Sequence, residues 1–494
     1  MVKLFISKKI YGLEDEPSSP ANFFFVKNGT VAEIGYCKNV ESIKGRADEV
    51  INFGNRVVVP GFIDAHTHLL QTGLTEIDTD LSEAKSISDV LSILSEDRKK
   101  GREDGYLRAY NLEIENVKEQ RYPTPFELDR VSKEFPIYVK TRDSHSCTVN
   151  TRAKELAGKK EGIVRGSDFE DVSLFFHKLL SKEKKIDAYR IGAELAAKNG
   201  VTTLHTLIGR DEPGDEELKI LMEIMDDLKV DVVPYYQSRN IELVKRFNLK
   251  GIGGCLLIDG SISSRTAGLF APYRDERRNK GMLYFRRKEL DRFIAQANGE
   301  NLQVAMHAIG DRAIEQLLSV YETVLKKNPR EDHRHRIEHC ELLNDNQIER
   351  MARLGICPSM QPAFDFYWGG KGGLYERRLG VKRAKKLNPL KKIINKGLKI
   401  AGGSDSPITP LNPLLGIHAA VNHNNKESRL DVGDGLRMFT TYSAYACFRE
   451  DNVGKLGTGY KADFAVLSED PFDIPKEQIK DVKIEKVYKE GIRI

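Results

Sequence analysis

The sequence predicts an α/β protein built on a (β/α)8 TIM barrel, with a large insertion after strand 1 and a small β-sandwich built from both chain ends. Three observations lead to this prediction. Eight short apolar segments alternate with longer stretches of helical periodicity, one gap between these segments is far longer than the others, and both chain ends carry short β-type segments. The alternation is typical of a parallel sheet with helical crossovers, and eight such units fit a closed barrel better than an open sheet.

Each predicted strand is a short apolar segment bounded by polar or turn-forming residues. The segments between the strands carry apolar residues at helical spacing, for example Glu216–Leu228, Leu290–Asn298 and Arg312–Leu325. This order of strand and helix is the repeat of the predicted barrel. In chain order, the strand segments are Val59–Ala65, Val201–Leu207, Val230–Tyr236, Gly254–Asp259, Leu302–His307, Arg334–His339, Gly355–Gln361 and Leu398–Gly403.

The gap between the first and second strand segments is abnormally long, at about 130 residues, where a crossover needs only a few tens. We therefore expect residues 72–186 to be an insertion, with helices at Ile87–Lys99 and Phe169–Leu180 and a strand at Pro136–Lys140. The insertion leaves the barrel at the C-terminal end of strand one, which is the catalytic end of such barrels. It is therefore predicted to form part of a lid over the substrate.

Both chain ends have the composition of small antiparallel sheets. Phe23–Val26 and Val31–Ile34 flank Asn28-Gly29, a pair that favours a two-residue hairpin turn because both residues tolerate positive φ. Asp463–Leu467 begins a similar series near the other end. Neither end can bury a core alone, so we expect the two to meet. The predicted domains are a composite β-sandwich of residues 1–57 and 447–494, a barrel of residues 58–446, and the insertion 72–186 within it.

Composition and charge narrow the class of function. A chain of 494 residues with 40% hydrophobic and 31% charged residues is typical of a soluble globular protein, and a net charge of +5 without a dense basic block does not favour a nucleic-acid partner.

No apolar run reaches the roughly 18 residues of a membrane helix, and the first residues lack a signal-peptide core. The six cysteines are scattered without a Cys-x-x-Cys pair, which favours a reducing compartment. We expect a cytoplasmic protein that acts on a small-molecule substrate and has no membrane partner. The sequence is also compatible with a homo-oligomer.

The first indication of chemistry is His66-Thr67-His68, which closes the first predicted strand. Residues i and i+2 of a strand point to the same face, so both imidazoles can bind one cation. A His-x-His pair alone is weak support for a metal site. Its place at the C-terminal end of a barrel strand, after Pro60–Asp64, strengthens the interpretation.

Five stretches of this chain resemble, in the same order, the motifs of one group of proteins. Pro60–His68 is similar to the opening signature of the amidohydrolase superfamily. The later stretches resemble its N-substituted formamide deformylase-like branch, amidohydrolase family three, and the similarity extends to Gly459–Asp463 near the end of the chain. These later stretches are Asp259-Gly260-Ser261 with Ser264-Arg265-Thr266-Ala267, His307–Ala313, Arg336–Cys340 and Gly403–Pro407.

The resemblance implies a divalent-metal site at the C-terminal ends of the barrel strands. It implies that His66, His68, His307 and His339 are ligands, and that Asp405 is both a ligand and a proton shuttle. Imidazole and carboxylate suit zinc, so the expected cofactor is one or two divalent ions, with Zn²⁺ as the first choice. Such an ion activates water and polarises a carbonyl, while the carboxylate takes the proton of the water and passes it to the departing amine. A purely structural role is plausible for each of these residues alone. It does not explain five such residues at four different strand ends.

A few further residues have a weaker claim to the site. The resemblance suggests that His145, in the insertion, faces the active site and acts in catalysis. Asp259 and Arg265 lie on the strand-four loop, and a contact with the substrate is expected for both. For Asp259 and Arg265, a helix-capping or ion-pair role has nearly equal weight. His205, at the end of strand two, is either a support for the ligands or a core residue, and His335 is expected to be structural.

The chain departs from the family pattern at Cys255. Members of this branch often have a lysine there, four residues before the Asp of Asp-Gly-Ser, and that lysine can bridge two metal ions when carbamylated. Either the site in this chain holds one ion, or the Cys255 thiolate takes the bridging place, since thiolate is a good zinc ligand. A buried apolar cysteine has comparable weight. On a strand Gly254–Asp259, Cys255 would lie deep in the barrel.

The leading functional hypothesis is hydrolysis of a C–N bond in an amide, N-acyl or N-formyl compound by metal-activated water. The alternative enzyme is a metal-dependent deaminase of a small cyclic or heterocyclic substrate on the same scaffold, because specificity in such barrels lies in the loops. A third hypothesis, a non-catalytic scaffold, predicts the loss of ligands, and all five are present.

Overall fold

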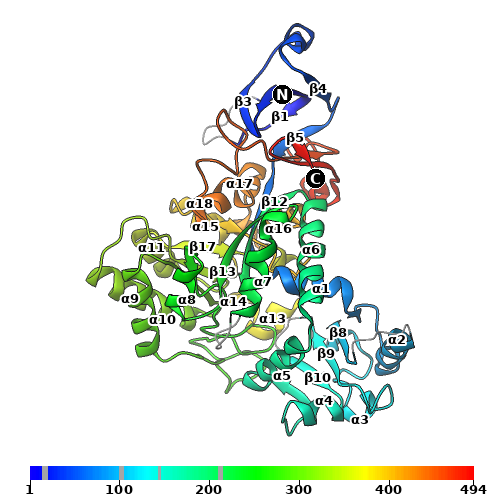
Figure 1. The fold of residues 1–494 in the computed structure, drawn as a ribbon. Coiled ribbons are helices and arrows are strands. Elements are labelled where there is room, and N and C mark those ends of the chain that lie inside the picture. Colours follow the sequence, from blue (N-terminus) through cyan, green and yellow to red (C-terminus); the bar gives the residue numbers. More distant parts are fainter. Residues whose placement is uncertain (14–19, 100–104, 143–145, 210–214) are drawn as a thin grey trace. The chain divides into compact units, whose positions relative to one another are not determined.

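A computed structural model of the protein describes residues 1–13, 20–99, 105–142, 146–209 and 215–494 (Figure 1). The chain forms two compact units: Met1–Leu69 together with Ala193–Ile494, and Leu70–Gly192. The first unit contains an eight-stranded parallel sheet and a mixed sheet from both chain ends, and the second contains a sheet of its own. Among the helices of the described residues, none combines the length and the apolar composition needed to cross a lipid bilayer.

The parallel sheet forms a nearly closed barrel, which confirms the predicted fold class. Its strands lie side by side in sequence order. The remaining gap is bridged where Thr67, at the end of the first strand, pairs in parallel with Ser406 after the last strand. The strands are β6 (Phe62–Thr67), β12 (Val201–Ile208), β13 (Asp231–Tyr236), β14 (Gly251–Ile252), β15 (Gln303–Ala308), β16 (Arg336–His339), β17 (Cys357–Met360) and β18 (Ala401–Gly402).

The helices between these strands bury the apolar faces that the sequence predicts. In α10, for example, Ile314, Leu317, Tyr321 and Val324 are buried at a spacing of three or four residues, which places them on one face. The helices of this part of the chain are α6 (Lys182–Lys198), α7 (Glu216–Ile224), α8 (Ile241–Arg246), α9 (Arg287–Gly299), α10 (Asp311–Lys327), α11 (Asp345–Leu354), α12 (Ala363–Trp368), α13 (Leu374–Leu379), α14 (Val381–Ala384), α15 (Leu390–Asn395), α16 (Pro413–Val421), α17 (Val432–Met438) and α18 (Thr441–Ala446).

The fourth strand differs from the predicted Gly254–Asp259. β14 covers only Gly251–Ile252, and Gly253 and Gly254 then take positive φ values of 91° and 57°. These two glycines turn the chain out of the sheet, because φ > 0 costs glycine little. Cys255 lies in this turn, so the prediction that it stands on strand four is wrong.

The mixed sheet joins the two chain ends, as predicted. Its strands follow the order β21-β20-β19-β5-β1-β2-β3, with β4 beside β1, and the pair β19–β5 links the ends. In Figure 1 the blue N-terminal strands and the red C-terminal segment lie together. Asn28 and Gly29, with φ of 51° and 78°, form the predicted hairpin turn. Between the two ends, the rings of Phe5, Phe464 and Tyr488 pack with centroids 4.5–5.4 Å apart. The strands are β1 (Val2–Ile10), β2 (Ala21–Lys27), β3 (Thr30–Gly35), β4 (Glu49–Asn52), β5 (Val57–Pro60), β19 (Phe464–Leu467), β20 (Ile484–Lys489) and β21 (Ile492–Arg493).

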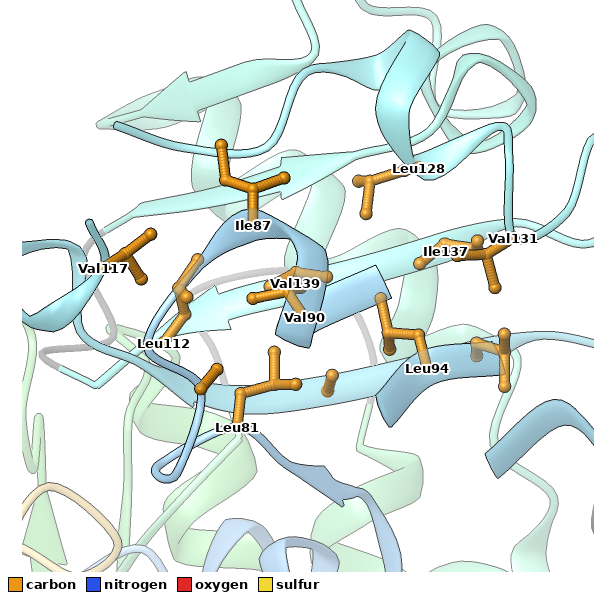
Figure 2. Close-up of a cluster of buried hydrophobic side chains, with 13 residues drawn as sticks. Leu81, Ile87, Val90, Leu94, Leu112, Val117, Leu128, Val131, Ile137 and Val139 are labelled. Atoms are coloured by element: carbon orange, nitrogen blue, oxygen red, sulfur yellow. The ribbon is translucent and has the colours of Figure 1, made fainter. Parts of the chain in front are cut away.

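The unit Leu70–Gly192 has its own five-stranded sheet, in the order β11-β10-β9-β8-β7, and its own core. Val90 and Leu94 of α2 pack with Ile137 and Val139 of β9 in this core (Figure 2). The lid role of residues 72–186 stays a prediction. The elements are α1 (Leu69–Ile77), β7 (Thr79–Asp80), α2 (Ile87–Lys99), β8 (Leu107–Leu112), α3 (Pro125–Leu128), β9 (Ile137–Thr141), β10 (Ser146–Val149), α4 (Thr151–Leu156), β11 (Ile163–Arg165) and α5 (Ser167–Lys178).

Candidate metal centre

Three polar side chains meet where the barrel closes. The Nε2 atoms of His66 and His68 lie 3.3 Å and 3.2 Å from Oδ1 of Asp405. The alternation of β6 brings both rings to one face, as the His-x-His spacing predicts. One ligand-type atom from each of the three residues lies within 4.8 Å of the others, which is a spacing that a single metal ion can span.

The backbone at the closure holds these side chains in place. Asp405 donates its N–H to the carbonyl oxygen of His66 at 2.8 Å, and His68 donates to the carbonyl of Ser406 at 2.9 Å. A Cβ atom on Gly403 would lie 2.7 Å from Cβ of His66, so a side chain at that position would push strands one and eight apart. The first and last barrel strands are therefore joined at the residues that could bind a metal.

A second group of side chains adjoins the first. Sγ of Cys255 lies 3.5 Å from Nδ1 of His307 and 3.8 Å from Nε2 of His339. The ring centroid of His339 is 4.4 Å from that of His307 and 4.8 Å from that of His66. Ligand-type atoms of His66, Cys255 and His339 again lie within 4.8 Å of one another. The structure thus brings together all five residues that the family resemblance names, and Cys255 with them.

Three buried histidines of the cluster, His66, His307 and His339, each direct one ring nitrogen away from the cluster toward an oxygen acceptor. Nδ1 of His66 lies 2.7 Å from Oε2 of Glu338, and Nδ1 of His339 lies 2.7 Å from Oε1 of Gln361. Nε2 of His307 lies 3.3 Å from a backbone carbonyl oxygen. A ring nitrogen that donates in such a bond leaves the other nitrogen with a free lone pair. In all three rings, the nitrogen that faces the cluster therefore has a lone pair with which it can bind a cation.

The space between His66 and Asp405 suits a cation. With its proton on Nδ1, His66 presents a bare Nε2 to Oδ1 of Asp405, and neither atom has a hydrogen-bond partner among the described residues. Two acceptors at this distance repel each other unless positive charge lies between them. Burial alone would lower the pKa of His66, but Asp405, Cys255 and Glu338 together raise that pKa well above its ordinary value, with Asp405 as the largest contributor. A proton and a metal ion would therefore compete for the same place.

Two residues of the cluster have left-handed backbone geometry. His339 has a φ of 73° and Asp405 a φ of 56°. Residues other than glycine adopt this region rarely, and they persist there where the surrounding structure holds them, often at functional sites. Here the conformation aims both side chains at the cluster, which is consistent with a functional role for it.

Asp259 and Arg265 make contacts within the loops around the cluster. The fully buried carboxylate of Asp259 accepts hydrogen bonds from three backbone N–H groups at 2.8–3.0 Å, one of them that of Gly310. Burial nonetheless raises the pKa of Asp259 above its ordinary value. Arg265 forms an ion pair with Asp275 at 2.9 Å. These contacts favour a positioning role for Asp259 and an ion-pair role for Arg265, and contact with substrate stays a prediction for both.

Of the other histidines, His145 lies outside the described residues, so its catalytic role stays a prediction. His205 is buried on β12, and its Nδ1 lies 3.0 Å from the Arg336 guanidinium, from which it accepts a hydrogen bond. Burial lowers the pKa of His205 and the charge of Arg336 lowers it further, so the ring is neutral. His335 bonds to the Asn298 side chain at 3.1 Å inside the core, the structural role expected of it.

Two residues beside the cluster were not identified from the sequence: Glu338 and Gln361, the acceptors behind His66 and His339. One signal could have indicated the first. Arg336 and Glu338 are opposite charges at i and i+2 of a short strand, which puts both on one face, and a buried charge needs a partner. Gln361 follows β17 directly, but a single glutamine after a strand carries no such signal.

Residues 49–494 match the model of the amidohydrolase family. The chain belongs to this family. That membership confirms the resemblance seen in the sequence motifs and makes the protein an amidohydrolase-family hydrolase.

Amidohydrolase relatives cover almost the whole chain. A putative amidohydrolase of Bacillus subtilis (strain 168), YtcJ, is 29% identical over 94% of each chain. N-substituted formamide deformylase of Arthrobacter pascens is 22% identical, with 97% of this chain and 95% of that protein covered. Among solved structures, an uncharacterized metal-dependent hydrolase from Pyrococcus furiosus superposes with a TM-score of 0.78 at 27% identity, covering 96% of this chain and 100% of that one.

Proposed function

We propose that this amidohydrolase is a metal-dependent enzyme that cleaves a C–N bond in an amide, N-acyl or N-formyl compound. The observation that carries the proposal is the pair of buried acceptors, Nε2 of His66 and Oδ1 of Asp405, which face each other at 3.3 Å with His68 beside them. The deformylase among the relatives supports an N-formyl or N-acyl substrate.

The proposed metal is zinc, held in two neighbouring positions. Imidazole nitrogen, carboxylate oxygen and thiolate sulfur together form a ligand set that suits zinc. When bound, such an ion polarises a carbonyl group and makes water a nucleophile near neutral pH. The first position would be held by His66, His68 and Asp405. The second would be held by His307, His339 and Cys255, whose sulfur lies 3.5 Å and 3.8 Å from ring nitrogens of the two histidines.

Asp405 is proposed to move the proton. Burial alone would raise the pKa of Asp405, but His66 and His68 hold it well below its ordinary value, so the group is a carboxylate. Oδ1 faces the two histidines, and we assign the proton transfer to Oδ2. This oxygen takes the proton of the attacking water as the new C–O bond forms. It then gives the proton to the leaving nitrogen as the C–N bond breaks, so the amine departs neutral.

Cys255 is proposed to be a thiolate ligand, the alternative that its surroundings favour over an apolar cysteine. An apolar thiol packs against carbon atoms, whereas this sulfur faces ring nitrogens of His307 and His339 at 3.5 Å and 3.8 Å. Burial alone would raise the pKa of Cys255, but the same histidines bring it well below its ordinary value. A thiolate at this position would occupy the place of the lysine of related sequences.

A substrate screen tests the reaction. Zinc-loaded protein would be assayed for amine release from N-formyl amines, N-acyl amines and cyclic amides, and for ammonia release from small amino-substituted heterocycles. We expect amine release that is lost in Asp405→Asn. Ammonia release without amide cleavage would establish the deaminase instead, and no turnover of either class by zinc-loaded protein would favour a non-catalytic scaffold.

A further inference from the structure

We propose that Arg336 and Glu338 form a positioning pair that fixes His66 in the tautomer needed to bind a metal, and that this pair sets the metal affinity of the site. The inference rests on the proposed function, in which His66 is a metal ligand. It assigns a role to two residues that touch neither the proposed ion nor the proposed path of the proton.

Arg336 is the centre of a buried network inside the barrel. Its side chain on β16 is completely buried, and its guanidinium donates to both carboxylate oxygens of Glu338, at 2.7 Å and 3.0 Å. The same group donates to the carbonyl oxygen of Ala65 on β6 at 2.7 Å, to Nδ1 of His205 on β12 at 3.0 Å and to Oγ of Ser359 on β17 at 3.0 Å. A single side chain therefore connects four of the barrel strands, including the strand that carries His66.

Glu338 connects this network to the metal centre. Its Oε2 atom accepts from Nδ1 of His66 at 2.7 Å, and the same oxygen accepts from the Arg336 guanidinium. The side chains of His66 and Glu338 are both 0% exposed, so no bulk water competes for these bonds. A proton fixed on Nδ1 leaves Nε2 unprotonated, and Nε2 is the atom that faces Asp405.

Arg336 fixes which group donates and which accepts in the hydrogen bond between Glu338 and His66. A guanidinium has only donors, so Glu338 can act toward Arg336 only as an acceptor, and it keeps the carboxylate charge that accepts from His66. Two apolar side chains would fill the same space without the cost of burying charge. An ion pair in this place is therefore better explained by control of the His66 ring than by stability of the barrel.

The test removes both charges together, because a single substitution would leave an unpaired buried charge. The variant Arg336→Leu/Glu338→Leu withdraws the acceptor from Nδ1 of His66. The probe is Co²⁺ added to metal-free protein, because its visible spectrum reports the ligand geometry without any assay of activity. We expect the dissociation constant for Co²⁺ to rise about 10- to 100-fold and the spectrum to change.

A conservative variant provides the rescue. Arg336→Met/Glu338→Gln also removes both charges but keeps an amide oxygen opposite Nδ1 of His66. The chain itself uses such an acceptor behind His339, where Oε1 of Gln361 lies 2.7 Å from Nδ1. This variant is expected to recover most of the Co²⁺ affinity that the leucine pair loses, a result that a purely structural role for the ion pair does not predict.

The matched control is the ion pair of Arg350 and Glu322, which joins α11 to α10 at 2.8 Å outside the cluster. Arg350→Met/Glu322→Gln makes the same chemical change and is expected to leave Co²⁺ binding unchanged. If the wild-type protein binds Co²⁺ and the leucine pair binds it equally tightly with the same spectrum, the inference is overturned. If the wild-type protein fails to bind Co²⁺, the proposed function falls, and this inference with it.

A third variant covers the case in which the leucine pair does not fold, as judged by circular dichroism. Glu338→Asp keeps the charge and the pairing with Arg336 but shortens the reach toward Nδ1 of His66 by one methylene group. We expect weaker Co²⁺ binding with near-native circular dichroism. Wild-type affinity in Glu338→Asp would contradict the positioning role.

Discussion

Nε2 of His68 lies 3.2 Å from Oδ1 of Asp405, although His68 follows the first barrel strand and Asp405 follows the last. Backbone hydrogen bonds between the segments that carry these residues hold the two together where the barrel closes. The proposed metal site therefore exists only in the folded barrel, and an ion bound there would join its two ends.

The first prediction follows from this linkage: zinc should stabilise the protein. A ligand that binds only the folded state at 100 times its dissociation constant adds about 2.7 kcal/mol. The apparent unfolding temperature of metal-free protein should therefore rise when zinc is added. His68→Ala should lose most of this gain, because it removes one ligand and leaves the barrel core intact. Equal unfolding temperatures with and without zinc would argue against a site at the closure.

The second prediction concerns the proton shuttle. Asp405→Asn keeps the shape of the side chain, but an amide cannot accept the proton of the attacking water, so turnover should fall about 10²- to 10⁴-fold. Circular dichroism should remain near native. Asp451→Asn, an exposed position, serves as the control and should keep full activity. Retention of more than about a tenth of the wild-type kcat in Asp405→Asn would make Asp405 a structural residue only.

The third prediction concerns the thiolate. Cys255→Ser should lower the bound zinc by about half, because a serine hydroxyl is a poor substitute for a thiolate ligand. Zinc per chain would be measured by elemental analysis after dialysis. Cys447→Ser is the matched control, since Cys447 is buried outside the cluster with its sulfur on a backbone carbonyl. Unchanged stoichiometry in Cys255→Ser would show that this cysteine only fills space.

The barrel was predictable because its signal is repeated and periodic. Of the clustered residues, His307, His339 and Asp405 were indicated by the family resemblance and not by periodicity. Eight alternating units indicate a closed parallel sheet, and strand alternation alone places His66 and His68 on one face.

Strand four was mispredicted because Gly254–Asp259 has the apolar composition of a strand. Two consecutive glycines with positive φ, Gly253 and Gly254, redirect the chain there instead. A Gly-Gly pair is a turn signal in the sequence, and the prediction gave it less weight than the apolar run that follows it.

The surroundings of the cluster were not predictable in the same way. Glu338 and Gln361, the acceptors behind the rings of His66 and His339, come from other segments of the chain than the rings they contact. The charges of Arg336 and Glu338 indicate a buried pair on one face of a strand, but no local pattern shows that Glu338 also meets His66. The approach of Cys255 to two histidines depends on a turn and not on strand parity. His145 stays a prediction, because it lies outside the described residues.

The fourth prediction is a pH dependence at Asp463, outside the metal centre. One oxygen of this buried carboxylate accepts from the N–H of Glu490 at 2.7 Å, and Oδ2 has no partner among the residues that the structure describes. Burial raises the pKa of Asp463 to about 6, whereas the unfolded value is about 3.9. The folded state therefore holds this proton more tightly, and stability is lost as the pH rises from about 4 to 6.

Asp463→Asn should remove this loss. The variant is expected to be more stable than the wild type at pH 8, by up to about 3 kcal/mol, the equivalent of a shift of roughly two pKa units. At pH 4 the advantage should vanish, because the wild-type carboxyl is then protonated in the fold. Unfolding temperatures of both proteins at the two pH values check this, and a difference of equal size at both would refute it.

Elemental analysis of the purified protein, followed by chelation, tests the central claim most directly. The two proposed positions predict about two divalent ions per chain, mainly zinc. It also predicts that a strong chelator abolishes hydrolysis while circular dichroism stays near native, because the barrel has its own core. Return of activity on addition of zinc would complete the result. Protein that contains no metal and hydrolyses its substrate equally well in the presence of a strong chelator would contradict the account.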